Sequence, residues 1–149
     1  MVRKKGVLEK NEFIPITGFH PLGTFTGQQT KNNTLLQSLY SETNADAIFI
    51  NHKKGSTLGL KTNDIVEIIN IDKPNMVTKA RVILSETIHP DALFSYYGMG
   101  AGYYRNITNG LRNANKIGFN PNHVSNFTFN PLTTGHPSQD FIVSIRKSV

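Results

Sequence analysis

The sequence from residue 48 to residue 64 reads Ile-Phe-Ile-Asn-His-Lys-Lys-Gly-Ser-Thr-Leu-Gly-Leu-Lys-Thr-Asn-Asp and leads directly into the apolar segment 65–70. It begins as a short apolar strand that ends at Asn51. The amide oxygen of Asn51 can accept a hydrogen bond from a backbone N–H at a helix start, which predicts a helical turn after it. Gly59 can end that turn, because glycine adopts the left-handed conformation without a Cβ clash. Asp64 then opens the next strand.

The clearest strand pair lies directly after this turn. Along residues 76–84, one face carries Met76, Thr78, Ala80, Val82 and Leu84, and the remaining side chains fall on the other face. This period of two indicates a strand with one buried side. Residues 64–71 have the composition of a second strand, and residues 72–75 form the link. We therefore expect a β-hairpin.

Five more segments are expected to form regular structure. Strands are expected at 13–17, 47–50, 92–97 and 140–146, and a short helix at 35–40. Pro15 favours an edge position for the first strand, because proline has no N–H to donate to a neighbour. The regions 18–34 and 98–134 are long and polar, and loops of that length usually bind ligands or partners. The sum is a mostly β fold, closed or sandwich-like, with one or two short helices.

Length and composition narrow the class of protein. With 149 residues the chain fits a single domain, in which residues 1–11 form a basic leader that we expect to be poorly ordered. No apolar run is long enough to span a membrane, so no membrane insertion is expected. The absence of cysteine excludes disulfides, thiolate nucleophiles and cysteine-ligated metals. The five histidines are scattered without paired spacing, so no metal-ligand set is predicted.

The charge of the chain allows two interpretations. The formal net charge is +6 and the isoelectric point is about 9.7. Much of this excess lies near the two ends of the chain, where it can simply favour solubility. It can also attract an anionic partner such as a nucleotide pyrophosphate or a nucleic acid, and charge alone does not separate these interpretations.

No residue has the setting of a catalytic group. Asp64 is more typical of a turn than of an acid catalyst, because no partner acid or base is placed near it in the sequence. No serine lies in a nucleophile-elbow motif. The glycine-rich run Gly98-Met-Gly-Ala-Gly102 lacks the following helix that a dinucleotide-binding βαβ unit requires.

Seven segments, in chain order, resemble those of a known family. They are Ile16-Thr17-Gly18, the threonine-rich loop 24–32, the block 48–64 with the following Ile65-Val66, the segment 80–91, Tyr97-Gly98-Met99-Gly100, the segment 118–124, and Asn130-Pro-Leu-Thr-Thr-Gly135. Together they resemble the molybdopterin-dinucleotide-binding C-terminal domain of the DMSO-reductase-type oxidoreductases. Asn63 stands where that family has glycine, and because asparagine tolerates a positive φ, a turn is still expected there. The last segment is most similar to the thiosulfate, polysulfide and arsenate reductase branch.

The resemblance implies a double-psi β-barrel that closes over two molybdopterin guanine dinucleotides, which hold molybdenum or tungsten. It implies that the metal ligand and most substrate contacts come from domains outside this chain, which is then not catalytic by itself. The loop 18–26 would line the pterin and pyrophosphate, Asn51 and His52 would approach the guanine or ribose, and Asn122 would reach the other pterin. The cofactor-binding residues implied in this way are Thr17, Gly18, Thr24, Thr26, Asn51, His52, Asp64 and Asn122.

The implied partners are the catalytic domains or large subunit of a thiosulfate- or polysulfide-reductase-like oxidoreductase, with an iron-sulfur electron-transfer subunit as a further candidate. A periplasmic location would follow for such an exported enzyme, and a cytoplasmic one otherwise. Two alternatives stay open. The chain could be a stand-alone barrel subunit of the formylmethanofuran-dehydrogenase type, or a basic β-barrel that binds nucleic acid. The sparse basic residues between positions 20 and 140 disfavour the second alternative.

Overall fold

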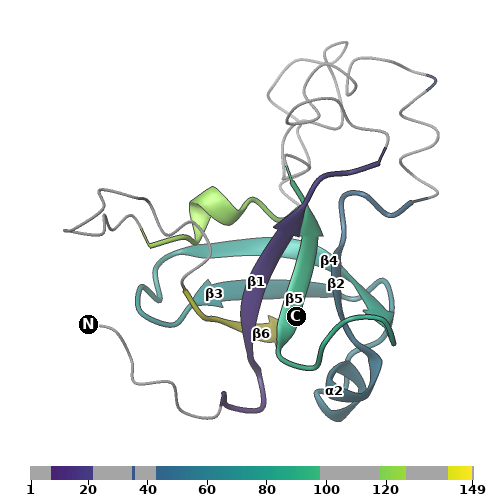
Figure 1. Ribbon diagram of the computed structural model, residues 1–149. Coiled ribbons are helices and arrows are strands. Elements are labelled where there is room, and N and C mark those ends of the chain that lie inside the picture. The colour runs from purple at the N-terminus through teal and green to yellow at the C-terminus, as the bar shows by residue number, and fades with distance from the viewer. Residues whose placement is uncertain (1–7, 22–34, 36–42, 98–117, 127–140, 149) are drawn as a thin grey trace.

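The computed structural model describes residues 8–21, 35, 43–97, 118–126 and 141–148 (Figure 1). Its described strands close into a barrel in the order β1-β5-β2-β4-β3-β6, in which β6 returns to β1. The elements are β1 (Glu12–Gly18), β2 (Ile48–Asn51), α2 (His52–Thr57), β3 (Ile65–Asn70), β4 (Val77–Ser85), β5 (Ala92–Tyr96), η3 (Pro121–His123) and β6 (Val143–Lys147).

The barrel mixes parallel and antiparallel pairs. β1 runs parallel to β5 and β2 runs parallel to β4, and the other four pairs are antiparallel. Parallel neighbours need a crossover connection, and here other elements supply it: α2 and β3 separate β2 from β4 in the chain, and β2, α2, β3 and β4 separate β1 from β5. The last strand, β6, pairs with β1 through Glu12 and Phe13 and with β3 along its whole length, and this pairing closes the barrel.

The predicted hairpin and its alternation are confirmed. β3 and β4 pair in antiparallel register from Ile65↔Arg81 to Ile69↔Val77. Thr78, Ala80 and Val82 are buried, whereas Lys79 between them is exposed. The alternate side chains expected on the buried face of this strand therefore do face the barrel interior, because successive residues of a strand point to opposite sides.

The prediction that Pro15 marks an edge strand is wrong, because β1 lies between β5 and β6 in the closed barrel. The physical reason for the prediction still holds at this position, because no neighbouring strand needs a hydrogen bond from the nitrogen of Pro15. Ile14 N–H donates to Asp91 O of the β5 side (2.8 Å), so the next position, Pro15, directs its nitrogen away from β5. On that side β6 pairs only with Glu12 and Phe13, so no β6 carbonyl loses a donor at the proline.

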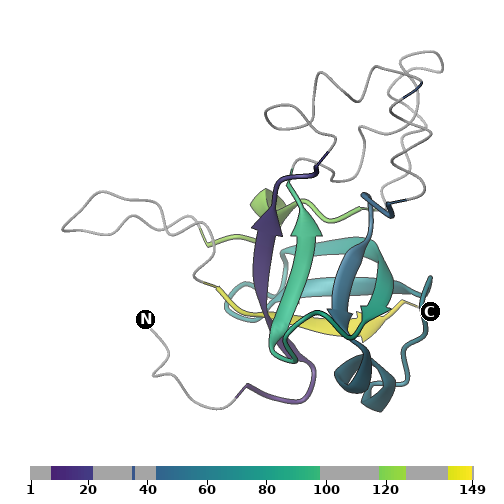
Figure 2. The same cartoon turned by 45° about the vertical axis from the view of Figure 1, so that its right-hand side comes forward.

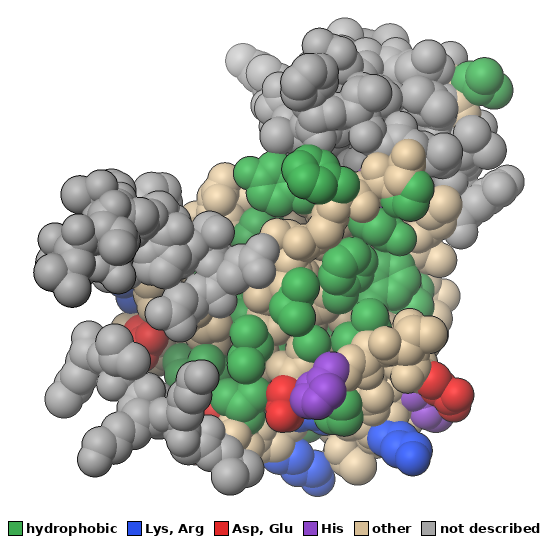
Figure 3. Space-filling model, in the orientation of Figure 1, with side chains coloured by type: hydrophobic (Ala, Val, Ile, Leu, Met, Phe, Trp, Pro, Cys, Tyr) green, Lys and Arg blue, Asp and Glu red, His purple; other side chains and the backbone are tan. Residues whose placement is uncertain are grey.

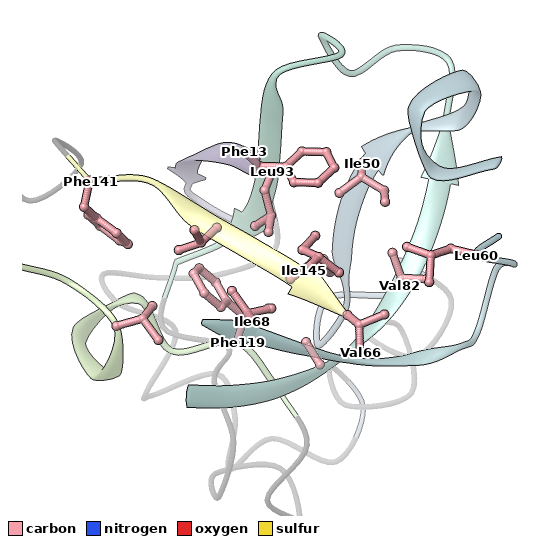
Figure 4. Close-up of a cluster of buried hydrophobic side chains, with 14 residues drawn as sticks. Phe13, Ile50, Leu60, Val66, Ile68, Val82, Leu93, Phe119, Phe141 and Ile145 are labelled. Carbon is pink, nitrogen blue, oxygen red and sulfur yellow. The ribbon is translucent and has the colours of Figure 1, made fainter. Parts of the chain in front are cut away.

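A hydrophobic core fills the barrel, and its side chains converge from different strands in Figure 4. It consists of Phe13, Ile48, Ile50, Leu60, Val66, Ile68, Ala80, Val82, Leu93, Phe119, Val124, Phe141, Val143 and Ile145. Burial of a Val, Leu, Ile or Phe side chain contributes about 1.5–3 kcal/mol, so this cluster supplies most of the driving force for closure. Phe119 and Val124 come from the segment around η3, which therefore covers one side of the barrel.

The predicted mainly β, closed barrel with a short helix is confirmed, and the sandwich-like alternative is excluded by closure. The strands expected at 47–50, 92–97 and 140–146 appear as β2, β5 and β6, with bounds that differ by at most three residues. The helix expected at 35–40 lies outside the described residues except for Leu35. In the described part of the chain, no helix has the length and apolar character needed to cross a membrane.

Candidate functional site

Asn51 joins β2 to α2 at one end of the barrel (Figure 2). Its Oδ1 accepts hydrogen bonds from the backbone N–H groups of Lys53 (3.0 Å) and Lys54 (3.3 Å). Its Nδ2 donates to the carbonyl oxygen of Ile88 (2.7 Å), and only 9% of the residue is exposed. The predicted helix cap is therefore confirmed, and the same amide also ties the connection between β4 and β5 to this end.

The turn after Asn51 ends as the sequence predicts. Gly59 has a φ of 71°, and Leu58 N–H donates to Lys54 O (3.2 Å) at the end of α2. Gly55, inside the helix, is buried because α2 packs closely on the barrel: a Cβ there would lie 2.4 Å from Cδ2 of Leu84. The helix is thus held against the ends of β2 and β4, and His52 stands exposed at its first position.

Asp64 fixes the turn that leads into β3. Its Oδ2 accepts from the Lys61 N–H (2.9 Å) and from Nζ of Lys147 (2.8 Å). The hydrogen bond from Lys147 is the main reason why the pKa of Asp64 lies below its usual value. The preceding Asn63 has a φ of 76°, which confirms the positive φ expected there, and its Oδ1 accepts from Arg81 (2.8 Å).

Thr17 and Gly18 lie at the other end of the barrel, where β1 ends beside the end of β5. Gly18 pairs with Tyr96, and its carbonyl oxygen accepts from Tyr97 N–H (2.6 Å). A Cβ on Gly18 would lie 2.9 Å from Cε2 of Phe94, so the glycine allows that aromatic ring to pack across the strand end. Thr17, half-buried, pairs with Ser95.

His20 is a buried residue at this end that the sequence does not single out. It is 3% exposed, and its Nε2 lies 2.8 Å from Oγ1 of Thr43. Its ring packs edge-on against Tyr96 with centroids 4.6 Å apart. Burial lowers the pKa of His20 below 6.5, because desolvation disfavours the charged imidazolium. The contact joins the chain after β1 to the chain before β2.

Two hydroxyl groups in the described part of the structure are buried without a hydrogen-bond partner, and they belong to Ser95 and Ser125. Ser95 is 2% exposed and belongs to the buried positions of β5, next to Thr17 in register. An unpaired buried hydroxyl costs about 1–3 kcal/mol, so each marks a place where a water molecule or a polar ligand atom would be stabilised.

Asn122 lies exposed in η3, and its backbone N–H donates to Oδ1 of Asn120 (3.1 Å). The position of this segment depends on a different amide, Asn70, which is fully buried and which the sequence does not single out. Asn70 Nδ2 donates to Val124 O (2.6 Å) and to Oδ1 of Asn126 (3.0 Å). Its Oδ1 accepts from two backbone N–H groups of the hairpin turn, so one side chain holds η3 and the turn together.

The described site residues do not form one pocket. Gly18 pairs with Tyr96 at one end of β5, whereas Asn51 follows Ile50, which pairs with Leu93 near the other end. These ends are about 13 Å apart at the usual strand rise. Asn51 pairs with Ser85, whereas the chain that leads into η3 and Asn122 meets β4 at Lys79, where Gly118 N–H donates to Lys79 O; Ser85 and Lys79 are about 20 Å apart along the strand.

Thr24 and Thr26 lie outside the described residues. Among the residues that are described, no group of three or more His, Asp or Glu side chains could hold a metal ion.

Comparison with known proteins identifies one family. The family model described as "Molydopterin dinucleotide binding domain" matches residues 17–141, which is more than half of the chain. The matched region begins at Thr17, at the end of β1, and includes the Asn51 turn, Asp64 and η3. No curated protein matches the chain.

Replacement of Asn51 by alanine should destabilise the barrel by about 1–3 kcal/mol, because it removes the helix cap and leaves Ile88 O without its donor. The control is Asn122→Ala, which removes an exposed amide and should change the free energy of unfolding by less than about 0.5 kcal/mol. Urea unfolding measures both. Equal stability of the two variants would show that the Asn51 hydrogen bonds do not support the fold.

The lowered pKa of His20 predicts a pH-dependent stability. His20 takes up a proton less readily in the folded chain than in the unfolded chain. The free energy of unfolding is therefore unaffected by His20 above pH 6.5, and it falls as the pH drops from 6.5 through the lowered pKa of the folded state. The loss stops below that pKa. Asp64 and Glu67, whose pKa values are also lowered, act only at more acidic pH.

The measurement is the unfolding midpoint of the native chain and of His20→Phe, which keeps an aromatic ring beside Tyr96, at several pH values. The substitution should remove the decrease between neutral pH and the folded pKa. An identical pH profile in both proteins would exclude His20 as its source.

Proposed function

This chain belongs to the molydopterin dinucleotide binding domain family, and we propose that it binds the guanine form of that cofactor, with molybdenum or tungsten, inside a larger oxidoreductase. As a member of the family it is the cofactor-binding domain of a molybdoenzyme. When bound, such a cofactor supplies the metal centre at which the redox chemistry takes place. The task of this chain is to hold and orient the organic part of the cofactor.

The end of the barrel that carries Thr17 and Gly18 supports a binding site for the pterin and pyrophosphate. The observation that carries the assignment of the cofactor is the family match, and the choice of this end is proposed from the chemistry of its residues. The residues present fit the group: Thr17 and the unpaired Ser95 hydroxyl lie next to each other in register at this end, and both carry a hydroxyl that can bond to a polar ligand atom. Neutral donors and acceptors of this kind suit a planar, uncharged ring system. The threonines at 24 and 26, which follow this end in the sequence, belong to the same proposal.

A second set of contacts is proposed at Asn51 and His52. A molybdopterin dinucleotide is a long ligand, with a tricyclic group at one end and a nucleoside at the other. Two separated contact sets on one barrel are compatible with such a ligand, or with two copies of it. Because both ends of the Asn51 amide already bond to the backbone, the exposed His52 ring is the better placed of the two for the guanine or ribose. Asn122, also exposed, and Asp64 complete the proposed set.

Within the family, we propose that the parent oxidoreductase belongs to the thiosulfate, polysulfide and arsenate reductase branch. The similarity of residues 130–135 supports it, and these residues lie outside the described part of the structure. On this proposal the larger partner supplies the metal ligand and the substrate contacts, and an iron-sulfur subunit carries electrons. The formylmethanofuran-dehydrogenase-type subunit would use the same barrel with a different partner.

The test is the nucleotide and metal content of the native protein with its natural partner polypeptides. After acid release we expect guanine nucleotide at one or two equivalents per chain, together with molybdenum or tungsten. Cytidine nucleotide in its place would contradict the guanine form, and the absence of both nucleotide and metal would contradict cofactor binding.

The Thr17 contact has its own test. Thr17→Val keeps the shape and strand preference of the side chain but removes the hydroxyl, so the complex should lose its nucleotide roughly three- to tenfold faster during dialysis. Thr57→Val, at the exposed end of α2, is the control and should behave like the native protein. Equal retention in the two variants would exclude a contact at Thr17.

A further inference from the structure

The outer surface of the barrel has a charged half. On β3, β4 and β6, Glu67 binds Lys79 (3.3 Å) and Arg146 (2.6 Å). The hydrogen bond from Arg146 is the first reason why the pKa of Glu67 lies below its usual value. Asp64 and Lys147 form another pair beside them. These charges neutralise one another across the strands, as expected of a face that stays in water.

The other half of the outer surface is apolar. It is formed by Ile14 and Ile16 of β1, Phe49 of β2, and Phe94 and Tyr96 of β5, which we call the β1–β5–β2 face. These five side chains are adjacent in register, since Ile16 pairs with Phe94, Phe94 pairs with Phe49, and Tyr96 is the next outward residue of β5. Hydrophobic side chains gather over β1 and β5 in Figure 3.

The aromatic rings of this face form one packed group. The ring centroids of Phe94 and Tyr96 are 5.2 Å apart, those of Phe49 and Tyr96 5.8 Å, and those of Phe49 and Phe94 6.0 Å. Beside them Ile14 and Ile16 remain 42% and 43% exposed. β1, β5 and β2 thus carry apolar side chains on both faces, which is typical of strands that are covered on both sides. An exposed apolar patch of this kind marks an interaction surface.

We propose that the β1–β5–β2 face docks on the catalytic polypeptide of the parent oxidoreductase, against an apolar and uncharged patch of that protein. This inference rests on the proposed function. No charged side chain belongs to the face, so nothing in it favours the phosphates of a nucleic acid or of lipid headgroups. A core of aromatic and aliphatic side chains without charge is the composition of a protein interface.

Two observations select the catalytic polypeptide over a second copy of this chain. The net charge of +6 opposes self-association, because two copies repel each other and a neutral or acidic partner does not. The face is also continuous with the proposed cofactor end, since Tyr96 pairs with Gly18. A polypeptide that encloses a cofactor bound at Gly18 therefore lies next to Tyr96 and can extend along β1 and β5.

Photo-crosslinking from the protein in its natural assembly tests the docking. A benzophenone amino acid replaces Ile16 in one protein and Val77 in the other; Val77 is a matched control, an aliphatic residue on β4 that is 42% exposed. We expect Ile16 to crosslink to the molybdenum-bearing catalytic polypeptide at least about tenfold more than Val77. A crosslink to a second copy of this chain, equal yields from both positions, or no protein crosslink would each overturn the proposal.

A pair of charge substitutions gives an independent measurement. Ile16→Glu should weaken the assembly about tenfold or more, because it would bury an unpaired carboxylate, whereas Val77→Glu should leave it unchanged. Circular dichroism of both variants verifies folding. Equal weakening by the two substitutions, or by neither, would contradict docking through this face.

The nucleotide content of the crosslinked samples separates this inference from the proposed function. Crosslinks to the catalytic polypeptide without any bound dinucleotide would keep the docking surface and contradict cofactor binding. Bound dinucleotide without crosslinks from Ile16 would support cofactor binding and contradict docking through the β1–β5–β2 face.

Discussion

The structure depends on the closure of the barrel by β6. This strand lies between β1 and β3, and without it both neighbours would present open edges to solvent. Closure gives every strand an inner and an outer side. The inner side is filled by the core, so ligands and partners have access only to the strand ends and to the outer surface. The binding properties of this protein therefore depend on the side chains and backbone groups at the strand ends and on the outer surface.

The two ends differ in how their polar groups are used. At the α2 end, the Asn51 amide bonds to the backbone on both sides and Asp64 bonds to two lysines, so these side chains hold turns in place. At the Gly18 end, a close-packed glycine, a buried hydroxyl without a partner and a buried histidine whose pKa is lowered by desolvation lie together. Of these groups only the Ser95 hydroxyl lacks a hydrogen-bond partner among the described residues, so a polar ligand atom could satisfy it. This contrast favours the Gly18 end for the ring system of the cofactor.

The sequence predicts the local structure well where one residue type decides it. Asn51 as a cap, Gly59 at positive φ and the alternation along β4 follow from the chemistry of single residues or from a period of two, and the turn at Asn63 follows from the resemblance together with the tolerance of asparagine for positive φ. The edge position inferred from Pro15 fails because it depends on the strand order, which residues distant in sequence determine. For the same reason the sequence does not reveal Asn70 or His20, whose partners are 54 and 23 residues away. Family resemblance supplies the cofactor, but only the register shows that Gly18 and Asn51 lie at opposite ends of β5.

Hydrogen–deuterium exchange of the assembled protein, with and without its dinucleotide, tests most directly whether the Gly18 end receives the cofactor. The backbone amides of residues 16–20 and 95–97 should exchange more slowly when the cofactor is bound, while those of the charged β3–β4 hairpin should not change. Unchanged exchange at 16–20 and 95–97 in the two forms would contradict it.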